Sequence, residues 1–143
     1  MATRTLLDTD IWSEILKAKD STVAARARTY HAEQGRYTLS VITVMEVIYG
    51  YSRVGREDRI RQFLALLDRA EVLWLDPTVA ELAGRIRSDL EQLGSKLTIE
   101  DTLIAATGIR HGLPIATGNT RHFLKVQEAG YPLVLENWRD PLS

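Results

Sequence analysis

The sequence predicts an α/β fold in which a central parallel sheet of four to five strands is flanked by helices. Short apolar runs of strand length alternate with longer segments of helical periodicity along the chain. This alternation is typical of parallel strands that lie between layers of helices. A length of 143 residues, with 45% hydrophobic and 26% charged residues, suits one domain with a substantial core. We therefore expect a single domain over residues 1–143.

The expected strands are the short apolar runs. The first, at residues 5–8, reads as a buried strand that ends on an acid. Similar runs predict strands at residues 37–40, 72–75, 113–117 and 132–135.

Helical spacing predicts seven helices between these strands. They are expected at residues 11–17, 23–34, 41–51, 56–69, 77–93, 99–111 and 120–126. Ser21 and Thr22 are suitable residues to cap the second helix, and Pro77 suits the first turn of the fifth. Gly94 and Gly112 follow the fifth and sixth helices as stop signals.

Charge and cysteine content exclude several classes of function. The formal net charge of −1 argues against a protein that holds nucleic acid through overall positive charge, although an acidic site would mask nearby arginines in that sum. The absence of cysteine excludes disulfides, thiolate metal sites and cysteine catalysis, and it fits a cytoplasmic protein. No apolar run suits a signal peptide or a membrane span, so no membrane association is expected.

Polar residues follow the first and fourth expected strands. Asp8 ends the first, and Asn119 stands just beyond the fourth. Because ligand sites of open parallel sheets form at the carboxyl ends of the strands, we expect these two side chains on the same rim.

Glu46 lies in an apolar helix, VITVMEVIYG, that leaves no evident polar face. A carboxylate removed from water without a partner costs several kcal/mol. Glu46 is therefore expected to pair with a buried arginine, to lie on a narrow solvent-facing stripe, or to be held in a cleft by a cation.

Asp101 opens the helix after Thr98, and the pair fits a capping box that needs no chemistry to explain it. The small residues that follow, Ala105, Ala106 and Gly108, would let this helix lie close against a neighbour.

Together these positions form an acid-rich set drawn from four segments: Asp8, Glu46, Asp101 and Asn119. Oxygen ligands of this kind suit Mg²⁺ or Mn²⁺. Without a cation, carboxylates at close range raise one another's pKa. With one, such a cluster can activate water against a phosphodiester.

Four segments in order, LLDTDIWSEIL, SVITVMEVIYG, TIEDTLIAATGIRHGLPIATGNTRHF and ENW, resemble the PIN-domain ribonucleases and, within them, the VapC toxins of type II toxin–antitoxin pairs. The resemblance covers residues 5–138. It implies a PIN-like three-layer sandwich and a metal-dependent endoribonuclease.

The resemblance also implies roles for particular residues. Asp8, Glu46 and Asp101 match the family's acids, and Asn119 occupies a fourth position where relatives carry aspartate or asparagine. The implied catalytic set is therefore these four residues, with Mg²⁺ or Mn²⁺ held mainly by Asp8 and Asp101. Implied partners are an RNA substrate, a cognate antitoxin and a second copy of the chain, which would form a homodimer that assembles with the antitoxin.

Some positions keep more than one interpretation. His122 stands where relatives commonly carry an acid, and Asp10 is expected to be a helix cap or an orienting residue. Trp12, Tyr49 and Tyr51 suit either the core or a partner interface. Candidate phosphate contacts, which are equally readable as solvated helix faces, are Arg53, Arg56, Arg59, Arg121 and Lys125.

Two other functions compete with this interpretation. A haloacid dehalogenase-type phosphatase also ends a strand on Asp-x-Asp, but it places Thr or Val two residues later, where this chain has Trp12. A PIN fold that is catalytically weak or inactive, and that acts as an RNA- or protein-binding module, is compatible with Asn119 and His122.

Overall fold

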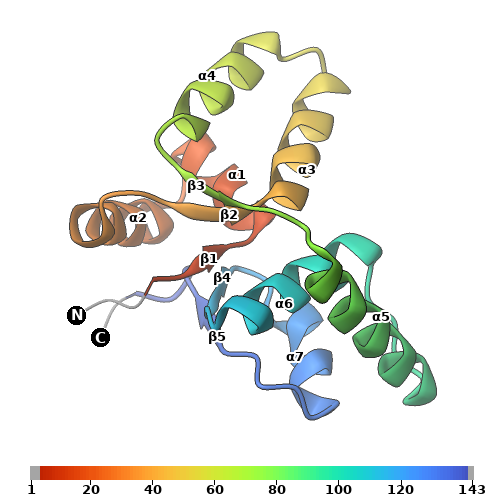
Figure 1. Ribbon diagram of the computed structural model, residues 1–143. Helices are drawn as coiled ribbons and strands as arrows, with labels where there is room; N and C mark the ends of the chain where they lie inside the picture. The colour runs from red at the N-terminus through yellow and green to blue at the C-terminus, as the bar shows by residue number, and fades with distance from the viewer. Residues whose placement is uncertain (1–3, 142–143) are drawn as a thin grey trace.

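The computed structural model describes residues 4–141 and contains a five-stranded parallel sheet with the strand order β3-β2-β1-β4-β5 (Figure 1). All four strand pairings are parallel, which confirms the predicted sheet. The strands are β1 (Leu6–Leu7), β2 (Thr38–Ser40), β3 (Glu71–Leu73), β4 (Ile115–Thr117) and β5 (Leu135–Asn137). The three central strands, β1, β2 and β4, are buried along their whole length, because helices cover both faces of the sheet.

The predicted position of the fifth strand was wrong by about three residues. The expected run was 132–135, whereas β5 pairs Leu135 with Ile115 of β4. Pro132 has no N–H to give to a ladder, so the chain joins the sheet only after it. The first β4 contact comes from the Ile115 N–H, which donates to the Val134 carbonyl at 2.8 Å.

Seven helices connect the strands within residues 4–141, and every predicted helix is present. They are α1 (Thr9–Lys17), α2 (Ser21–Gln34), α3 (Val41–Ser52), α4 (Glu57–Leu67), α5 (Pro77–Gln92), α6 (Ile99–His111) and α7 (Thr120–Glu128). The predicted cap of α2 was wrong by one to two residues. Asp20 is the N-cap, and its carboxylate accepts hydrogen bonds from the backbone N–H groups of Thr22 and Val23.

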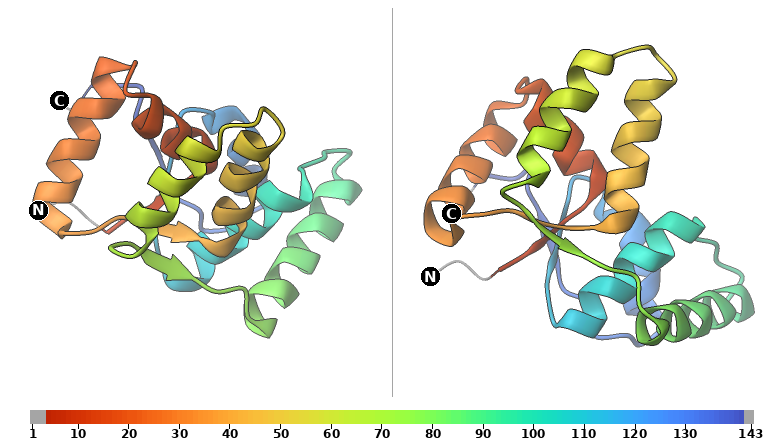
Figure 2. Two further views of the ribbon diagram at one scale, coloured as in Figure 1. Left: turned by 90° about the horizontal axis from the view of Figure 1, so that it is seen from above. Right: turned by 45° about the horizontal axis from the view of Figure 1, so that its top comes forward.

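The helices form two layers, one on each face of the sheet (Figures 1 and 2). Helices α1–α4 lie on one side, and α5–α7 lie on the other. Successive strand residues serve opposite layers, since Leu6 faces α5–α7 while Leu7 faces α1–α4. This is the three-layer sandwich that the resemblance implied.

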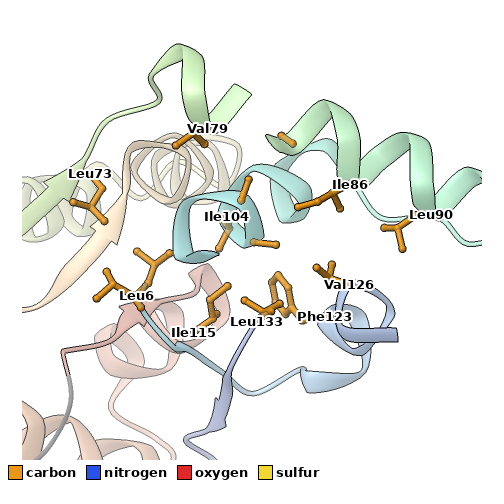
Figure 3. Packing of buried hydrophobic residues seen from close by; sticks show 14 residues of the cluster. Leu6, Leu73, Val79, Ile86, Leu90, Ile104, Ile115, Phe123, Val126 and Leu133 are labelled. Carbon is orange, nitrogen blue, oxygen red and sulfur yellow. The ribbon is translucent and has the colours of Figure 1, made fainter. Parts of the chain in front are cut away.

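The core beneath α5–α7, here called the aliphatic core, contains one aromatic side chain, Phe123, among its buried residues. Figure 3 shows α6 between the sheet residues Leu6 and Ile115 and the α5 residues Val79 and Ile86. The opposite core, here called the aromatic core, contains these four large rings: Trp12, Tyr30, Phe63 and Trp138.

Helix α6 lies unusually close to β4. A Cβ added to Gly108 would lie 3.0 Å from Ile115 Cγ1 and 3.1 Å from the Leu113 carbonyl oxygen. The small residues of α6 therefore permit the close approach that the sequence predicted, and they fix the helix whose first turn carries Asp101.

Within the described residues, no helix combines the length and the apolar character needed to span a bilayer. The predicted limits of a single domain, residues 1–143, extend into terminal residues that lie outside the described range, and the domain assignment stays a prediction.

Candidate active site

The four side chains predicted from the sequence line one open cavity of about 250 Å³ at the carboxyl end of the sheet. They come from different elements. Asp8 follows β1, Glu46 lies in the middle of α3, Asp101 lies in the first turn of α6 and Asn119 precedes α7. The cavity walls also contain Thr9, Asp10 and His122.

Asp8 is held by two hydrogen bonds at the junction of β1 and α1. It is the N-cap of α1, and its Oδ1 accepts from the Thr9 backbone N–H at 2.8 Å. Its Oδ2 accepts from Thr117 Oγ1 at 3.0 Å. The side chain is buried, with 6% of the residue exposed, so its orientation is fixed by both bonds.

Asp10 orients the turn between β4 and α7. Its Oδ2 accepts from the Gly118 backbone N–H at 2.9 Å, and Thr117 Oγ1 lies 3.3 Å from its Oδ1. Since Asp8 is the N-cap, the interpretation of Asp10 as a helix cap was wrong, whereas its interpretation as an orienting residue is confirmed. Thr117 joins the two aspartates and also accepts from the Asn119 backbone N–H at 2.9 Å.

Glu46 points into the cavity and is held by Thr9, whose Oγ1 donates to Glu46 Oε1 at 2.7 Å. No arginine pairs with Glu46 within residues 4–141, so the expected buried ion pair was wrong. Helix α3 does have an exposed stripe, on which Met45 is 48% and Tyr49 is 61% exposed. Glu46 itself is half-buried beside the acids.

Asp101 both belongs to a helix cap and lines the cavity. Its backbone N–H donates to Thr98 Oγ1 at 3.1 Å, as the capping pattern predicted. Its Oδ2 lies 3.4 Å from His122 Nδ1, and the same ring nitrogen lies 3.2 Å from Asn119 Nδ2. The sequence marked His122 only as a departure from the family pattern, and its contact with Asp101 was not predicted.

Sequence reasoning also missed the two threonines that hold the acids, Thr9 and Thr117. Each stands next to a predicted strand end, and that position was the available signal. A single threonine produces no repeating pattern in the sequence. The hydrogen bonds of Thr9 to Glu46 and of Thr117 to Asp8 are therefore visible only in the folded chain.

Burial and like charge act together on the carboxylates. The pKa of Asp8 is raised well above its usual value, first by burial and then by the charges of Asp10 and Asp101. The hydrogen bonds from Thr9 and Thr117 lower it only in part. Burial likewise raises the pKa of Glu46, against the hydrogen bond from Thr9. The pKa of Asp101 is also raised by burial, although His122 opposes the shift.

The donor set fits a hard divalent cation that keeps part of its water shell. Each carboxylate oxygen has more than one lone pair, so Asp8 retains capacity beyond its two hydrogen bonds. Within residues 4–141, no three His, Asp or Glu side chains are arranged as direct ligands of one ion. The carboxylate and amide oxygens that line the cavity are of the kind that Mg²⁺ and Mn²⁺ prefer.

None of the predicted phosphate contacts is among the lining residues of this cavity. Arg56 forms two hydrogen bonds with Asp58, Arg59 donates to the Leu16 carbonyl, and Lys125 donates to the Lys96 carbonyl. Arg53 lies over the Tyr49 ring at 5.7 Å. Their interpretation as solvated helix faces fits these contacts better.

The aromatic residues with two interpretations fall into different environments. Trp12 is completely buried in the aromatic core, Tyr51 packs partly against it, and Tyr49 is exposed. The core interpretation is therefore confirmed for Trp12, and Tyr49 alone keeps the surface needed for an interface.

Comparison with known proteins agrees with this geometry, because the PIN domain family model matches residues 5–129. The chain belongs to the PIN domain family. A relative in Shigella flexneri, named tRNA(fMet)-specific endonuclease VapC, is 33% identical over 122 residues, which cover 85% of this chain and 90% of that protein. Toxin FitB of Neisseria gonorrhoeae is 31% identical and covers 94% of this chain and 99% of its own length.

A solved relative supports the same fold. The structure described as DNA-bound VapBC from Salmonella typhimurium superimposes with a TM-score of 0.80 at 28% identity, covering 96% of this chain and 99% of that one. The PIN fold predicted from the sequence is therefore confirmed.

Proposed function

We propose that this chain is a metal-dependent endoribonuclease of the VapC type, a toxin that cleaves RNA and is neutralised by a cognate antitoxin. The observation that carries the proposal is the convergence of Asp8, Glu46, Asp101 and Asn119, from four separate segments, on one cavity. The relatives named as ribonucleases and toxins support the substrate class and the biological role.

In this proposal Asp8 and Asp101 hold Mg²⁺ or Mn²⁺. The ion, when bound, stabilises negative charge on a phosphodiester and makes a bound water a better nucleophile. Asp8 is prepared for this role because Thr9 and Thr117 fix both of its oxygens. The raised pKa of Asp8 reflects charge repulsion that a cation would relieve.

Glu46 is proposed to orient the attacking water and to accept its proton. The Thr9 hydroxyl occupies Oε1, which leaves Oε2 without a hydrogen bond or ion pair to another described residue, and Glu46 lines the cavity. A raised pKa makes Glu46 a stronger base than an ordinary surface glutamate.

Asn119 contributes an amide without charge. It stands at the start of α7, and its backbone N–H is fixed by Thr117. We propose that the amide oxygen binds a water of the metal or the substrate, so that a second metal position would be held more weakly than in an all-carboxylate site.

Partner binding is part of the same proposal. The solved relatives include VapBC complexes from Salmonella typhimurium and the FitAB complex bound to a DNA fragment. We propose that this chain likewise pairs with an antitoxin and forms a homodimer within the complex. The exposed apolar side chains Tyr49 and Trp74 suit such contacts, and light scattering of the chain with and without antitoxin measures both states.

The decisive experiment measures cleavage by the antitoxin-free protein. Total RNA is incubated with the chain in Mg²⁺, in Mn²⁺ and in chelator, and the products are mapped by sequencing. Asp8→Asn and Asp101→Asn are expected to lower the rate at least 100-fold, the size of effect seen when a transition-state electrostatic contact is removed.

Asp68→Asn is a matched control, because Asp68 is an exposed aspartate at the end of α4 and lies outside the site cavity. It should cleave as the parent does. Cleavage that survives chelation or both site substitutions would exclude the proposed mechanism.

One observation favours a second candidate, an RNA- or protein-binding module with weak or absent catalysis. His122 Nδ1 lies 3.4 Å from Asp101 Oδ2, and the fourth position is the neutral Asn119. A protonated His122 would compete with a cation for Asp101. RNA binding without cleavage in either metal would favour this candidate.

A further inference from the structure

A second cavity, of about 280 Å³, lies between α1 and α3 and shares the Glu46 wall with the candidate active site. The two helices run side by side on the same face of the sheet (Figure 2). The volume is close to the roughly 300 Å³ at which pockets for drug-sized ligands begin, so it suits one ring system. The two cavities therefore adjoin at Glu46.

The wall residues of this cavity differ from those of the carboxylate site. Lys17, in the last turn of α1, contributes a cation, and no acid within residues 4–141 pairs with it. Val47 and Val54 contribute apolar surface, and Tyr51 contributes an aromatic ring. The cavity thus combines the positive charge of Lys17, next to the shared carboxylate of Glu46, with apolar and aromatic side chains.

The carboxylate cavity offers a phosphate no lysine or arginine, because its walls contain none. A nucleic-acid strand that enters that cavity needs cationic contacts beside it. Lys17 lines the adjoining cavity, which shares Glu46 with the carboxylate cavity.

Gly50 lines the second cavity and contributes no side chain to it. It lies in the last turn of α3, and a Cβ built on it would meet no atom within 4 Å. A Cβ at this position causes no clash, so a larger side chain can be introduced beside the cavity without disturbing the helix.

We propose that this cavity binds the nucleotide next to the scissile phosphodiester of the RNA substrate. Its base lies against Val47, Val54 and the Tyr51 ring, and Lys17 contacts the adjacent backbone phosphate. Stacking on aromatic side chains and cationic backbone contacts are the two components of single-strand recognition. The inference rests on the proposed function, because it assigns a substrate subsite to the proposed ribonuclease.

The test uses two variants of the full chain and two matched controls. Gly50→Leu fills the cavity, and Gly84→Leu places the same side chain on an exposed glycine of α5 that also meets no atom within 4 Å. Lys17→Ala removes the cation, and Lys19→Ala removes an exposed lysine nearby that does not line the cavity. Neither control residue belongs to the proposed site.

Binding is measured first, without catalysis. Fluorescence anisotropy follows a labelled, short, random-sequence single-stranded RNA in chelator at several salt concentrations. Gly50→Leu is expected to weaken binding about 10-fold, which is the effect of losing one stacked base. Lys17→Ala should lower the slope of log K against log salt by about 0.7, the value for one lost phosphate contact on a single strand.

Cleavage is measured next in Mg²⁺ and Mn²⁺, and the ends are mapped by sequencing. A binding role for one nucleotide predicts that Gly50→Leu changes the base preference at the position beside the cut and raises KM more than it lowers kcat. A merely structural effect would lower activity on all sequences equally, and it would then appear in Gly84→Leu as well.

The outcomes separate this inference from the proposed function. If the parent binds RNA, Gly50→Leu weakens that binding and the parent cleaves no RNA, the catalytic proposal is overturned and the subsite is retained. Unchanged binding and base preference in Gly50→Leu overturns the subsite while catalysis stands. Unchanged RNA binding together with reduced retention of a co-expressed antitoxin also overturns it, and assigns the cavity to the protein partner.

Discussion

On one face of the sheet, beneath α5–α7, the core is built from aliphatic side chains and a single ring, Phe123. On the other face, beneath α1–α4, four large rings share the core, and Trp12 contacts Phe63 and the partly buried Tyr37 edge to face. Trp12 lies at the centre of these contacts, with the rings of Tyr37 and Phe63 at 5.2 and 5.8 Å. The two faces therefore reach full burial with different side-chain chemistry.

The difference matters because the candidate site spans both layers. Asp101 and Asn119 belong to the aliphatic side, whose helix α6 is fixed by contact at Gly108. Asp8 is the N-cap of α1, and Glu46 lies in the middle of α3. Both helices belong to the aromatic side, and the second cavity lies between them. Close packing at Gly108 thus positions the helix that carries Asp101, and the second cavity lies on the other side of the sheet, beside Glu46.

The largest expected effect comes from removing a ring from each core. Phe123→Ala should lower the free energy of unfolding by about 3–5 kcal/mol. Phe63→Ala should lower it by about 1 kcal/mol more, because it also loses the edge contact with Trp12. Urea unfolding measures both values, and the exposed Leu124→Ala serves as a control with little change. Equal losses at the two phenylalanines would remove the energetic distinction between the cores.

A matched pair of glycines tests how closely the aliphatic side is packed. Gly108→Ala should cost about 1–3 kcal/mol, since its methyl would meet Ile115 and the Leu113 carbonyl. Gly84→Ala, on the exposed face of α5, should add about 0.5–1 kcal/mol, because alanine favours the helix and meets no atom. Chemical denaturation of both variants measures whether each change raises or lowers the free energy of unfolding. If Gly108→Ala stabilised the protein, the α6–β4 contact would have room for an added methyl group, and the close packing proposed here would be wrong.

The boundary between the layers carries buried negative charge, and Asp8→Asn should relieve it. In chelator at neutral pH we expect the midpoint of thermal unfolding to rise by about 4 °C, which corresponds to about 1 kcal/mol in a chain of this size. Asparagine keeps the oxygen that caps α1, so the cap is retained.

The pH dependence of this effect follows from the direction of the shift. The pKa of Asp8 is raised in the folded state by burial and by its acidic neighbours, so the folded chain retains the proton that the unfolded chain releases above about pH 4. The parent therefore loses stability as the pH rises through the folded pKa, and Asp8→Asn does not. Thermal unfolding across this range measures the gap, which should widen with pH and narrow when Mg²⁺ is added. A gap that is constant with pH would exclude the charge explanation.

The smallest expected effect concerns the indole of Trp12. Its buried Nε1 has no hydrogen-bond partner within the described residues, and an unsatisfied donor costs about 1–3 kcal/mol. Trp12→Phe removes that cost together with part of the ring, so we expect a net change of less than about 1.5 kcal/mol. Trp138→Phe should cost more, because the Trp138 Nε1 donates to Glu136 at 3.3 Å. Urea unfolding of the pair checks the ranking, and a larger loss at Trp12 would contradict it.

Much of the fold was predictable because its signals are local. The central strand β1 is an apolar pair, Leu6 and Leu7, and the end of α6 carries a glycine, Gly112, in the left-handed conformation that a helix stop requires. Glu46 was predictable for a similar reason, since an isolated acid in an apolar helix is costly wherever the helix lies. Asp8 was identified because it ends a buried strand.

The predictions that failed depended on which distant atoms meet. Asp10 was assigned two roles, and the choice between them depended on a Gly118 N–H more than a hundred residues away in the chain. The start of β5 depended on its pairing with Ile115. The five candidate phosphate contacts were expected near the rim that carries the acids. Lys17 was not among them, and it lines the second cavity because α1 packs beside α3.

The sequence by itself therefore determined the α/β class, the order of helices and strands and the four residues of the candidate site, because backbone preference and the cost of burying charge act over a few neighbouring residues. Only the tertiary structure decided the strand order β3-β2-β1-β4-β5, the threonines that hold Asp8 and Glu46, the contact of His122 with Asp101 and the cavity beside Gly50. Those features arise where segments far apart in sequence pack together, and the geometry of that packing is set by the whole chain at once.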